Sequence, residues 1–124
     1  MTAVETYVAW NFHERRPGVR SFSGWRDLPR FIGLAADAGL EVIVRPSPYI
    51  CAEWDAGGLP SWLRETERVP LRTADPRFLS AVAAWYDDLI PRLVPLQRTN
   101  GGPIVSMQVE NEYGSYADDH DYME

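Results

Sequence analysis

The sequence predicts an α/β fold with a parallel sheet, forming part of a (β/α)8 barrel. Three observations lead to this prediction. Segments with strand and helix periodicity alternate, which is typical of parallel strands joined by crossover helices. Reactive side chains follow the end of each predicted strand, at the edge where such barrels carry their active sites. The 124 residues are about half of the roughly 250 that a complete barrel needs, so they supply only some of its strands.

The first half of the chain predicts strand, helix and strand in that order. Residues 4–12 (VETYVAWNF) are rich in β-branched and aromatic side chains and form the first predicted strand. Asp27 is the N-cap of the following helix, with Pro29 in its first turn, and Gly39 stands where a left-handed residue ends a helix. Residues 41–45 (EVIVR) form a short apolar strand, as expected when both faces are covered.

The second half predicts a long loop, a helix and a third strand. The irregular stretch 46–74 is long for an idle connector, and loops of this size are usually functional. Asp75 caps the second helix, which Pro91 is expected to kink and Pro95 to end. A Gly-Gly turn then leads into the third strand, residues 103–110 (PIVSMQVE). A small doubly wound sheet is the alternative, but it needs a Gly-rich phosphate-binding loop after its first strand, which this sequence lacks.

Composition excludes several classes of function. The formal charge of −6 argues against a nucleic-acid binder, which needs a basic face. No apolar run approaches the roughly 20 residues that cross a bilayer, so no membrane partner is expected. The single cysteine forms no internal disulfide, and the start of the chain has no signal-peptide pattern. No linker divides the chain, so residues 1–124 are treated as one unit. The compartment stays open, with the cytoplasm favoured.

The sharpest candidate for chemistry is residues 108–114 (QVENEYG), at the end of the third predicted strand. Glu110 and Glu112 are two residues apart, so in a strand they share one face and Asn111 takes the other. Strand ends often depart from this alternation, and the alternative is that Asn111 and Glu112 both enter a site. A carboxylic acid kept protonated there by burial or by a second carboxylate can donate a proton to a leaving oxygen. The alternative is solvated charge or a structural ion pair with Arg45, and for the pair alone this alternative is favoured.

The second candidate is residues 45–58 (RPSPYICAEWDAGG). Glu53 either accepts hydrogen bonds from a hydroxylated ligand beside an aromatic wall, or holds the loop through backbone N–H groups. Cys51 is expected to be a small buried apolar residue. His13 is interpreted either as a hydrogen-bonding residue at the barrel mouth or as a satisfied core histidine. The spacing of the histidines and acidic residues matches no metal-ligand pattern, so no metal is predicted.

Three motifs together resemble glycoside hydrolase family 35, the retaining β-galactosidases. They are ETYVAWNFHE (5–14), RPSPYICAEWDAGGLPSWL (45–63) and GGPIVSMQVENEYGSY (101–116), in the order and at the separations of that family. The resemblance implies a (β/α)8 catalytic barrel in which this chain supplies strands two to four with their helices. The rest of the barrel would then be missing on both sides.

The resemblance also implies roles for individual residues. Glu112 matches the general acid/base, and Asn111 matches the residue that hydrogen-bonds the sugar 2-hydroxyl. Glu53, through its side chain, and Ala52, through its backbone, match the loop that holds galactose hydroxyls. Tyr7 matches a tyrosine that contacts the sugar. Glu110 matches a supporting residue of the same motif.

The implied reaction removes terminal β-galactose from β-galactosides by double displacement, without metal or organic cofactor. The nucleophilic Glu of the family lies beyond residue 124, so the isolated chain is expected to be inactive. One departure is Ser47, where the family commonly has Gly; a positive φ there would strain the backbone. Two other hypotheses remain: a truncated, non-catalytic product with at most weak sugar binding, and a related retaining glycosidase with another sugar preference.

Overall fold

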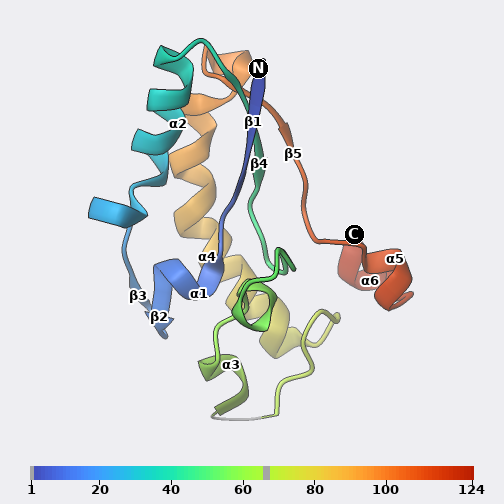
Figure 1. Cartoon of the computed structure of the whole chain (residues 1–124). Coiled ribbons are helices and arrows are strands. Elements are labelled where there is room, and N and C mark those ends of the chain that lie inside the picture. Colours follow the sequence, from blue (N-terminus) through green and yellow to red (C-terminus); the bar gives the residue numbers. More distant parts are fainter. Residues whose placement is uncertain (1, 66–67) are drawn as a thin grey trace.

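The computed structural model describes residues 2–65 and 68–124, and a three-stranded sheet lies at its centre (Figure 1). Its strands are β1 (Ala3–Tyr7), β4 (Glu41–Arg45) and β5 (Ile104–Met107), in the order β1-β4-β5. Both pairings are parallel, with Ala3 opposite Glu41 and Val42 opposite Ile104. The predicted α/β class with a parallel sheet is therefore confirmed. The sheet is open, and β1 and β5 are its edges.

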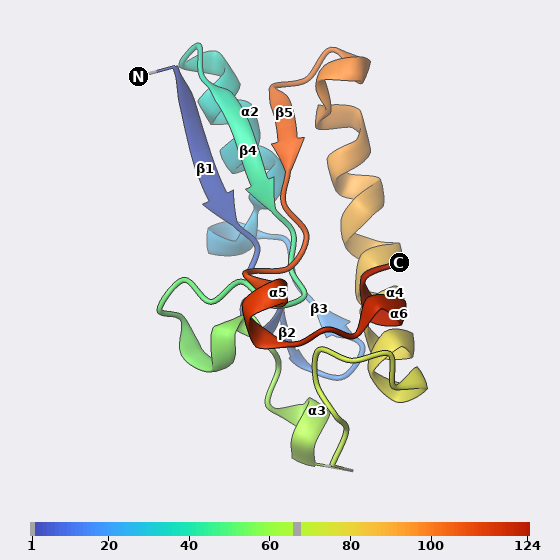
Figure 2. The same cartoon turned by 90° about the vertical axis from the view of Figure 1, so that its right-hand side faces the viewer.

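Two long helices, α2 (Leu28–Asp37) and α4 (Pro76–Leu93), cover one face of this sheet (Figures 1 and 2). Each helix starts directly after the aspartate that was predicted to cap it. The Asp27 carboxylate accepts a hydrogen bond from the backbone N–H of Arg30 at 3.0 Å, and Asp75 accepts one from Arg77 at 2.9 Å. These caps confirm the predicted helix starts. Helix α4 continues through Pro91 and ends two residues before Pro95.

The hydrophobic core lies between the sheet and these helices. Alternate residues of β4, Val42 and Val44, are fully buried, and they pack in one cluster with Phe78, Trp85 and Leu89 of α4. The other residues of β4 are only half-buried. These residues are Glu41, Ile43 and Arg45, so the uncovered face of the sheet carries two charged side chains of β4.

The first predicted strand is too long, because β1 ends at Tyr7. Residues Trp10–His13 form the short helix α1, followed by a hairpin of β2 (Glu14–Arg16) and β3 (Val19–Arg20). The Trp10 indole N–H donates to the Glu14 carboxylate at 2.8 Å, and both side chains are buried. The aromatic residues after Tyr7, whose sequence resembles a strand, therefore form a short helix, and the Trp10 side chain is buried in the core.

The third predicted strand is also shorter than expected, since β5 ends at Met107. Residues after it leave extended geometry, and Glu110 has a φ of 64°. The long stretch 46–74 contains the short helix α3 (Trp62–Glu65). The other short helical elements are η1 (Gly24–Arg26), η2 (Asp55–Gly58), η3 (Val94–Leu96), η4 (Arg98–Asn100), α5 (Tyr113–Tyr116) and α6 (His120–Met123).

The loops that follow the three strands lie together at one end of the sheet (Figure 2). All three strands point towards that end, because they are parallel. The candidate site residues therefore belong to one edge of the fold. Within the described part of the chain, no helix has the length and apolar character needed to span a membrane.

Candidate active site

Arg45, the last residue of the middle strand, connects side chains of β1 with a side chain of the loop after β5. Its Nε donates to the Glu5 carboxylate at 2.6 Å, and its Nη1 donates to the Asn111 side-chain oxygen at 3.1 Å. The guanidinium carbon lies 5.0 Å from the centre of the Tyr7 ring. Tyr7 and Asn111, predicted from separate motifs, are therefore brought to one cation on the uncovered face of the sheet.

Glu110 is buried and paired with Arg72, not with Arg45 as the ion-pair alternative supposed. Arg72 Nη2 lies 2.7 Å from Glu110 Oε2, and Nε donates to the same carboxylate at 3.1 Å. The phenol of Tyr122 donates to its other oxygen at 2.6 Å. Burial and this contact with Glu110 raise the pKa of Tyr122, so the phenol keeps its proton. Glu110 thus has a supporting position rather than one open to a ligand.

Glu112 follows this buried pair and is exposed. Its φ of 50° and ψ of 36° are left-handed, and it stands immediately before α5. Residues 110–112 therefore depart from strand alternation, the alternative expected for a strand end, because both glutamates have left-handed backbones. No hydrogen bond or ion pair joins the Glu112 carboxyl to another residue in the described ranges. This carboxyl is free to contact a ligand.

The loop after β4 is held in an unusual conformation. Cys51, Ala52 and Glu53 all have left-handed backbones, with φ of 56°, 55° and 52°. Asn11 holds the next turn, because its amide donates to the Asp55 carbonyl at 3.0 Å and accepts from the Trp54 indole at 2.8 Å. The Glu53 side chain is exposed and makes no hydrogen bond or ion pair within residues 2–65 and 68–124, which leaves its carboxylate available to a ligand.

Cys51 is exposed, so the prediction that it is a buried apolar residue is wrong. Its left-handed backbone turns the loop away from the core. Nothing in its surroundings marks it as a nucleophile.

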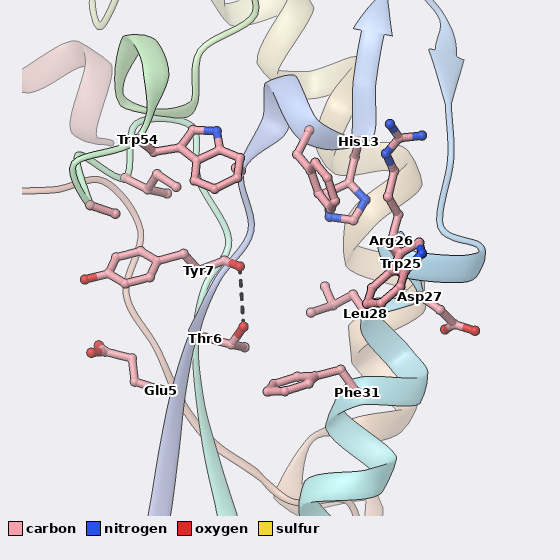
Figure 3. A pocket seen from close by; sticks show the side chains of 14 residues that line it. Glu5, Thr6, Tyr7, His13, Trp25, Arg26, Asp27, Leu28, Phe31 and Trp54 are labelled. Atoms are coloured by element: carbon pink, nitrogen blue, oxygen red, sulfur yellow. Dashed lines mark hydrogen bonds between the residues drawn. The ribbon is translucent and has the colours of Figure 1, made fainter.

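A cavity of about 440 Å³ lies beside the outer edge of β1 (Figure 3). In this view Tyr7 and Trp54 stand opposite Leu28 and Phe31 of α2. Ala52 also lines the cavity, whereas Glu53, Asn111 and Glu112 lie outside it. Asn111 and Glu112 lie outside the cavity because they follow β5, and β4 separates β5 from β1 in the sheet.

His13 belongs to the core rather than to the candidate site. It is buried, its Nδ1 lies 2.9 Å from the Ser21 carbonyl, and its ring stacks on Phe22 with 4.5 Å between centroids. Burial lowers its pKa, so the neutral imidazole is favoured. Among residues 2–65 and 68–124, no group of three or more His, Cys, Asp or Glu side chains is placed to hold a metal ion.

Sequence reasoning missed Arg72, the central residue of the network behind Glu112. It lies in the long loop and is 38 residues from Glu110, so no local pattern connects the two. The available signal is its place in the long irregular stretch 46–74, because loops of this size are usually functional. The role of Asn11 in holding the Trp54 turn could not be predicted either, because Asn11 and Trp54 are 43 residues apart in the sequence.

Comparison with known proteins agrees with the three motifs. A β-galactosidase of Bos taurus is 56% identical over 124 residues, which are 99% of this chain and 19% of that protein. A β-galactosidase of Homo sapiens is 54% identical, with 99% and 18% covered. A β-galactosidase-1-like protein of Mus musculus is 55% identical, with 99% and 19% covered. The chain therefore spans about a fifth of the length of these curated relatives.

The family described as glycosyl hydrolases family 35 matches residues 1–124, which is every residue of the sequence. Together with the identity to the relatives, this shows that the chain belongs to glycosyl hydrolases family 35.

Proposed function

We propose that this chain supplies the acid/base half of a β-galactosidase active site, with Glu112 as the acid/base. The observation that carries the proposal is the convergence on Arg45. Tyr7 at the end of β1 and Asn111 after β5 both contact the residue that ends β4. Glu112 is adjacent to Asn111, and its carboxyl is exposed at the edge where parallel α/β barrels bind substrates.

In the proposed mechanism, protonated Glu112 donates its proton to the glycosidic oxygen while a second carboxylate attacks the anomeric carbon. Retention requires the two carboxyl groups to lie about 5–5.5 Å apart. Glu112 then removes a proton from water, and this water releases the sugar. The proposal takes the nucleophile from outside residues 1–124, because Glu110 is buried against Arg72 and Glu53 is assigned to hydroxyl binding.

Asn111, Tyr7, Glu53 and Ala52 are proposed to bind the terminal galactose. Arg45 holds the Asn111 amide oxygen, which leaves its NH₂ group to donate to a sugar hydroxyl. The left-handed backbone of residues 51–53 presents Glu53 at the surface of the loop. Neither a metal nor an organic cofactor has a part in this mechanism.

Family membership implies a TIM-barrel-like catalytic domain, and we place this chain at strands two to four of it. Three features support that position: the strands are parallel, the long helices cover only one face of the sheet, and the two edge strands have no strand paired to their outer sides. In this arrangement the cavity beside β1 is covered by the preceding strand and helix of the barrel. The Phe31 side chain and the almost completely exposed indole of Trp25 line that cavity.

The test uses the complete protein, meaning residues 1–124 with the chain that its coding sequence adds on either side. We expect it to hydrolyse aryl and alkyl β-galactosides with retention, and Glu112→Gln to lower kcat/KM for an alkyl galactoside by about 10²–10⁴-fold. Glu53→Gln tests hydroxyl binding and is expected to raise KM. Unchanged activity in Glu112→Gln rejects the assignment. An α-glucoside and a β-glucoside serve as the sugar controls.

A non-catalytic product is the second candidate, and the observation that favours it is that Glu110, the carboxylate closest to Glu112 in the sequence, is buried against Arg72. Reading the coding sequence on either side separates the two candidates. A downstream Glu at the end of a seventh predicted strand supports the enzyme, and a stop codon directly after residue 124 supports the non-catalytic product.

A further inference from the structure

Arg72 makes an unusually complete set of contacts for a loop residue. Its side chain is buried, and its guanidinium lies between two aromatic rings, 3.9 Å from the centre of Tyr49 and 4.0 Å from that of Tyr116. The Tyr113 phenol donates to its backbone carbonyl at 2.8 Å. Arg72 itself has a left-handed φ of 58°. These contacts fix both the plane and the position of the guanidinium.

The fixed guanidinium holds the segment that leads to Glu112. Nε and Nη2 donate to the Glu110 carboxylate, and Nη2 also donates to the Asn111 carbonyl at 2.7 Å. The Glu110 carboxylate in turn accepts from the Asn111 backbone N–H at 3.0 Å. Arg72 therefore binds both the side chain of Glu110 and the backbone carbonyl of Asn111.

The backbone of this segment needs such support. Glu110 and Glu112 are both left-handed, with φ of 64° and 50°, a conformation that non-glycine residues adopt at a cost. The segment also lies beyond the end of β5, so the sheet ladder does not hold it. Contacts from outside the sheet, above all those of Arg72, oppose its relaxation to extended geometry.

We propose that Arg72 is a positioning residue, which sets the orientation of Glu112 for proton donation through Glu110 and the Asn111 carbonyl. This inference rests on the proposed function of Glu112. The hydrogen bonds of the Arg72 guanidinium go to Glu110 and Asn111 and not to Glu112, so its proposed effect on Glu112 is indirect. Lysine cannot replace it, because an ammonium lacks the planar fork that binds a carboxylate and a carbonyl while stacked between two rings.

The test is Arg72→Lys in the complete protein, measured with two substrates. Dinitrophenyl β-galactoside has a leaving group that departs without protonation, whereas methyl β-galactoside requires the proton from Glu112. The ratio kcat/KM reports the steps up to departure of the leaving group. We expect a loss of about 10–100-fold with the methyl galactoside, as for a small misplacement of a catalytic group. With dinitrophenyl galactoside the expected loss is below about 3-fold, since proton donation contributes little there.

Arg20→Lys is the matched control, because Arg20 also holds a buried carboxylate, that of Glu14, at 2.8 Å in the hairpin β2–β3. A substitution that only reduces the folded fraction lowers kcat/KM for both substrates by the same factor. This is the result expected for Arg20→Lys. Glu110→Gln keeps the shape of the pair and is expected to show the substrate-dependent loss of Arg72→Lys in milder form.

The outcomes separate the two proposals. Equal losses on both substrates in Arg72→Lys, or no loss on either, overturn the positioning role while leaving Glu112 as the acid/base. An unmutated complete protein that hydrolyses neither galactoside, or a Glu112→Gln variant without the substrate-dependent loss, overturns the proposed function itself.

Discussion

The guanidinium of Arg45 contacts both Tyr7, the last residue of the edge strand β1, and Asn111, in the loop that follows the other edge strand, β5. Its Nη1 donates to the Asn111 side-chain oxygen at 3.1 Å, and its central carbon is 5.0 Å from the Tyr7 ring centre. Two residues far apart in the sequence therefore share one neighbour at the carboxyl ends of the parallel strands. The middle strand sets their spacing, since Arg45 ends it.

Arg45→Met is expected to raise KM of the complete protein about 10-fold or more, because the Asn111 amide loses the donor that orients it for a sugar hydroxyl. Hydrolysis rates at varied galactoside concentration give this value. Arg98→Met is the control: Arg98 pairs with Glu41 at 2.5 Å at the opposite end of β4, and both side chains are exposed. Exposed pairs contribute about 0–1 kcal/mol, so KM should not change. An equal rise in both variants contradicts the role of Arg45.

The parts of the fold that depend on local sequence signals could be predicted. Asp27 and Asp75 cap the two long helices as expected, Gly39 is left-handed with φ of 75°, and β4 has the predicted bounds. The end of β1 could not be predicted, because the aromatic residues after Tyr7 are equally typical of a buried strand. Burial of Trp10 against Glu14 and the core decides their conformation, and that contact is tertiary.

Prediction of the site has a similar limit. The motif residues were identified from the sequence, and Tyr7 and Asn111 do share a neighbour. The buried pair of Arg72 and Glu110 joins two loops, and no periodicity records such a contact. The assignments of Glu112, Glu53 and Ala52 stay predictions, and Glu112→Gln and Glu53→Gln test the first two.

The isolated 124-residue chain is expected to self-associate. Both edges of its sheet are unpaired, and Tyr7, Trp25 and Phe31 are exposed around the cavity beside β1. Size-exclusion chromatography should show species larger than the 14.1 kDa monomer. The double change Trp25→Ser with Phe31→Ser should reduce this association, whereas Val19→Ser, in the exposed hairpin, should not. A stable monomer at all concentrations contradicts the open-sheet interpretation.

His13 makes stability depend on pH. Its pKa is lowered from 6.5, first by burial and then by the positive charges of Arg26 and Arg92, against the opposing effect of the Ser21 carbonyl. The unfolded chain therefore binds more protons than the folded chain between the lowered pKa and 6.5. The free energy of unfolding rises with pH across this window and falls as the pH drops below about 6.5.

His13→Phe keeps an aromatic ring and removes the titration. We expect the urea midpoint of this variant to change less between about pH 5 and about pH 7 than that of the unmutated protein. Its stability at neutral pH should be lower by about 1 kcal/mol, because the hydrogen bond with Ser21 is lost. Exposed His120→Gln is the control and should keep the original pH dependence. Parallel pH profiles for His13→Phe and the unmutated protein would exclude His13 as the cause.

Ser47 carries the strain that a positive φ predicts, since its φ is 90° in a buried position. Its hydroxyl donates to the Val8 carbonyl, and its own carbonyl accepts from Tyr86 at 2.7 Å. Both Ser47→Ala and Ser47→Gly remove the hydroxyl, at a cost of about 1 kcal/mol. Only glycine removes the left-handed penalty of about 1–2 kcal/mol, and its added freedom in the unfolded chain costs about 0.5–1 kcal/mol.

Ser47→Gly should therefore be more stable than Ser47→Ala by about 0.5–1 kcal/mol, measured by urea unfolding of the complete protein. Ser106 in β5 is the matched control, because it is an exposed strand residue without a positive φ. There the order should reverse, with Ala more stable than Gly, since glycine only adds unfolded-state freedom. The same order at both positions would show that backbone strain at Ser47 contributes nothing, because of these two serines Ser47 has the left-handed φ and the buried side chain.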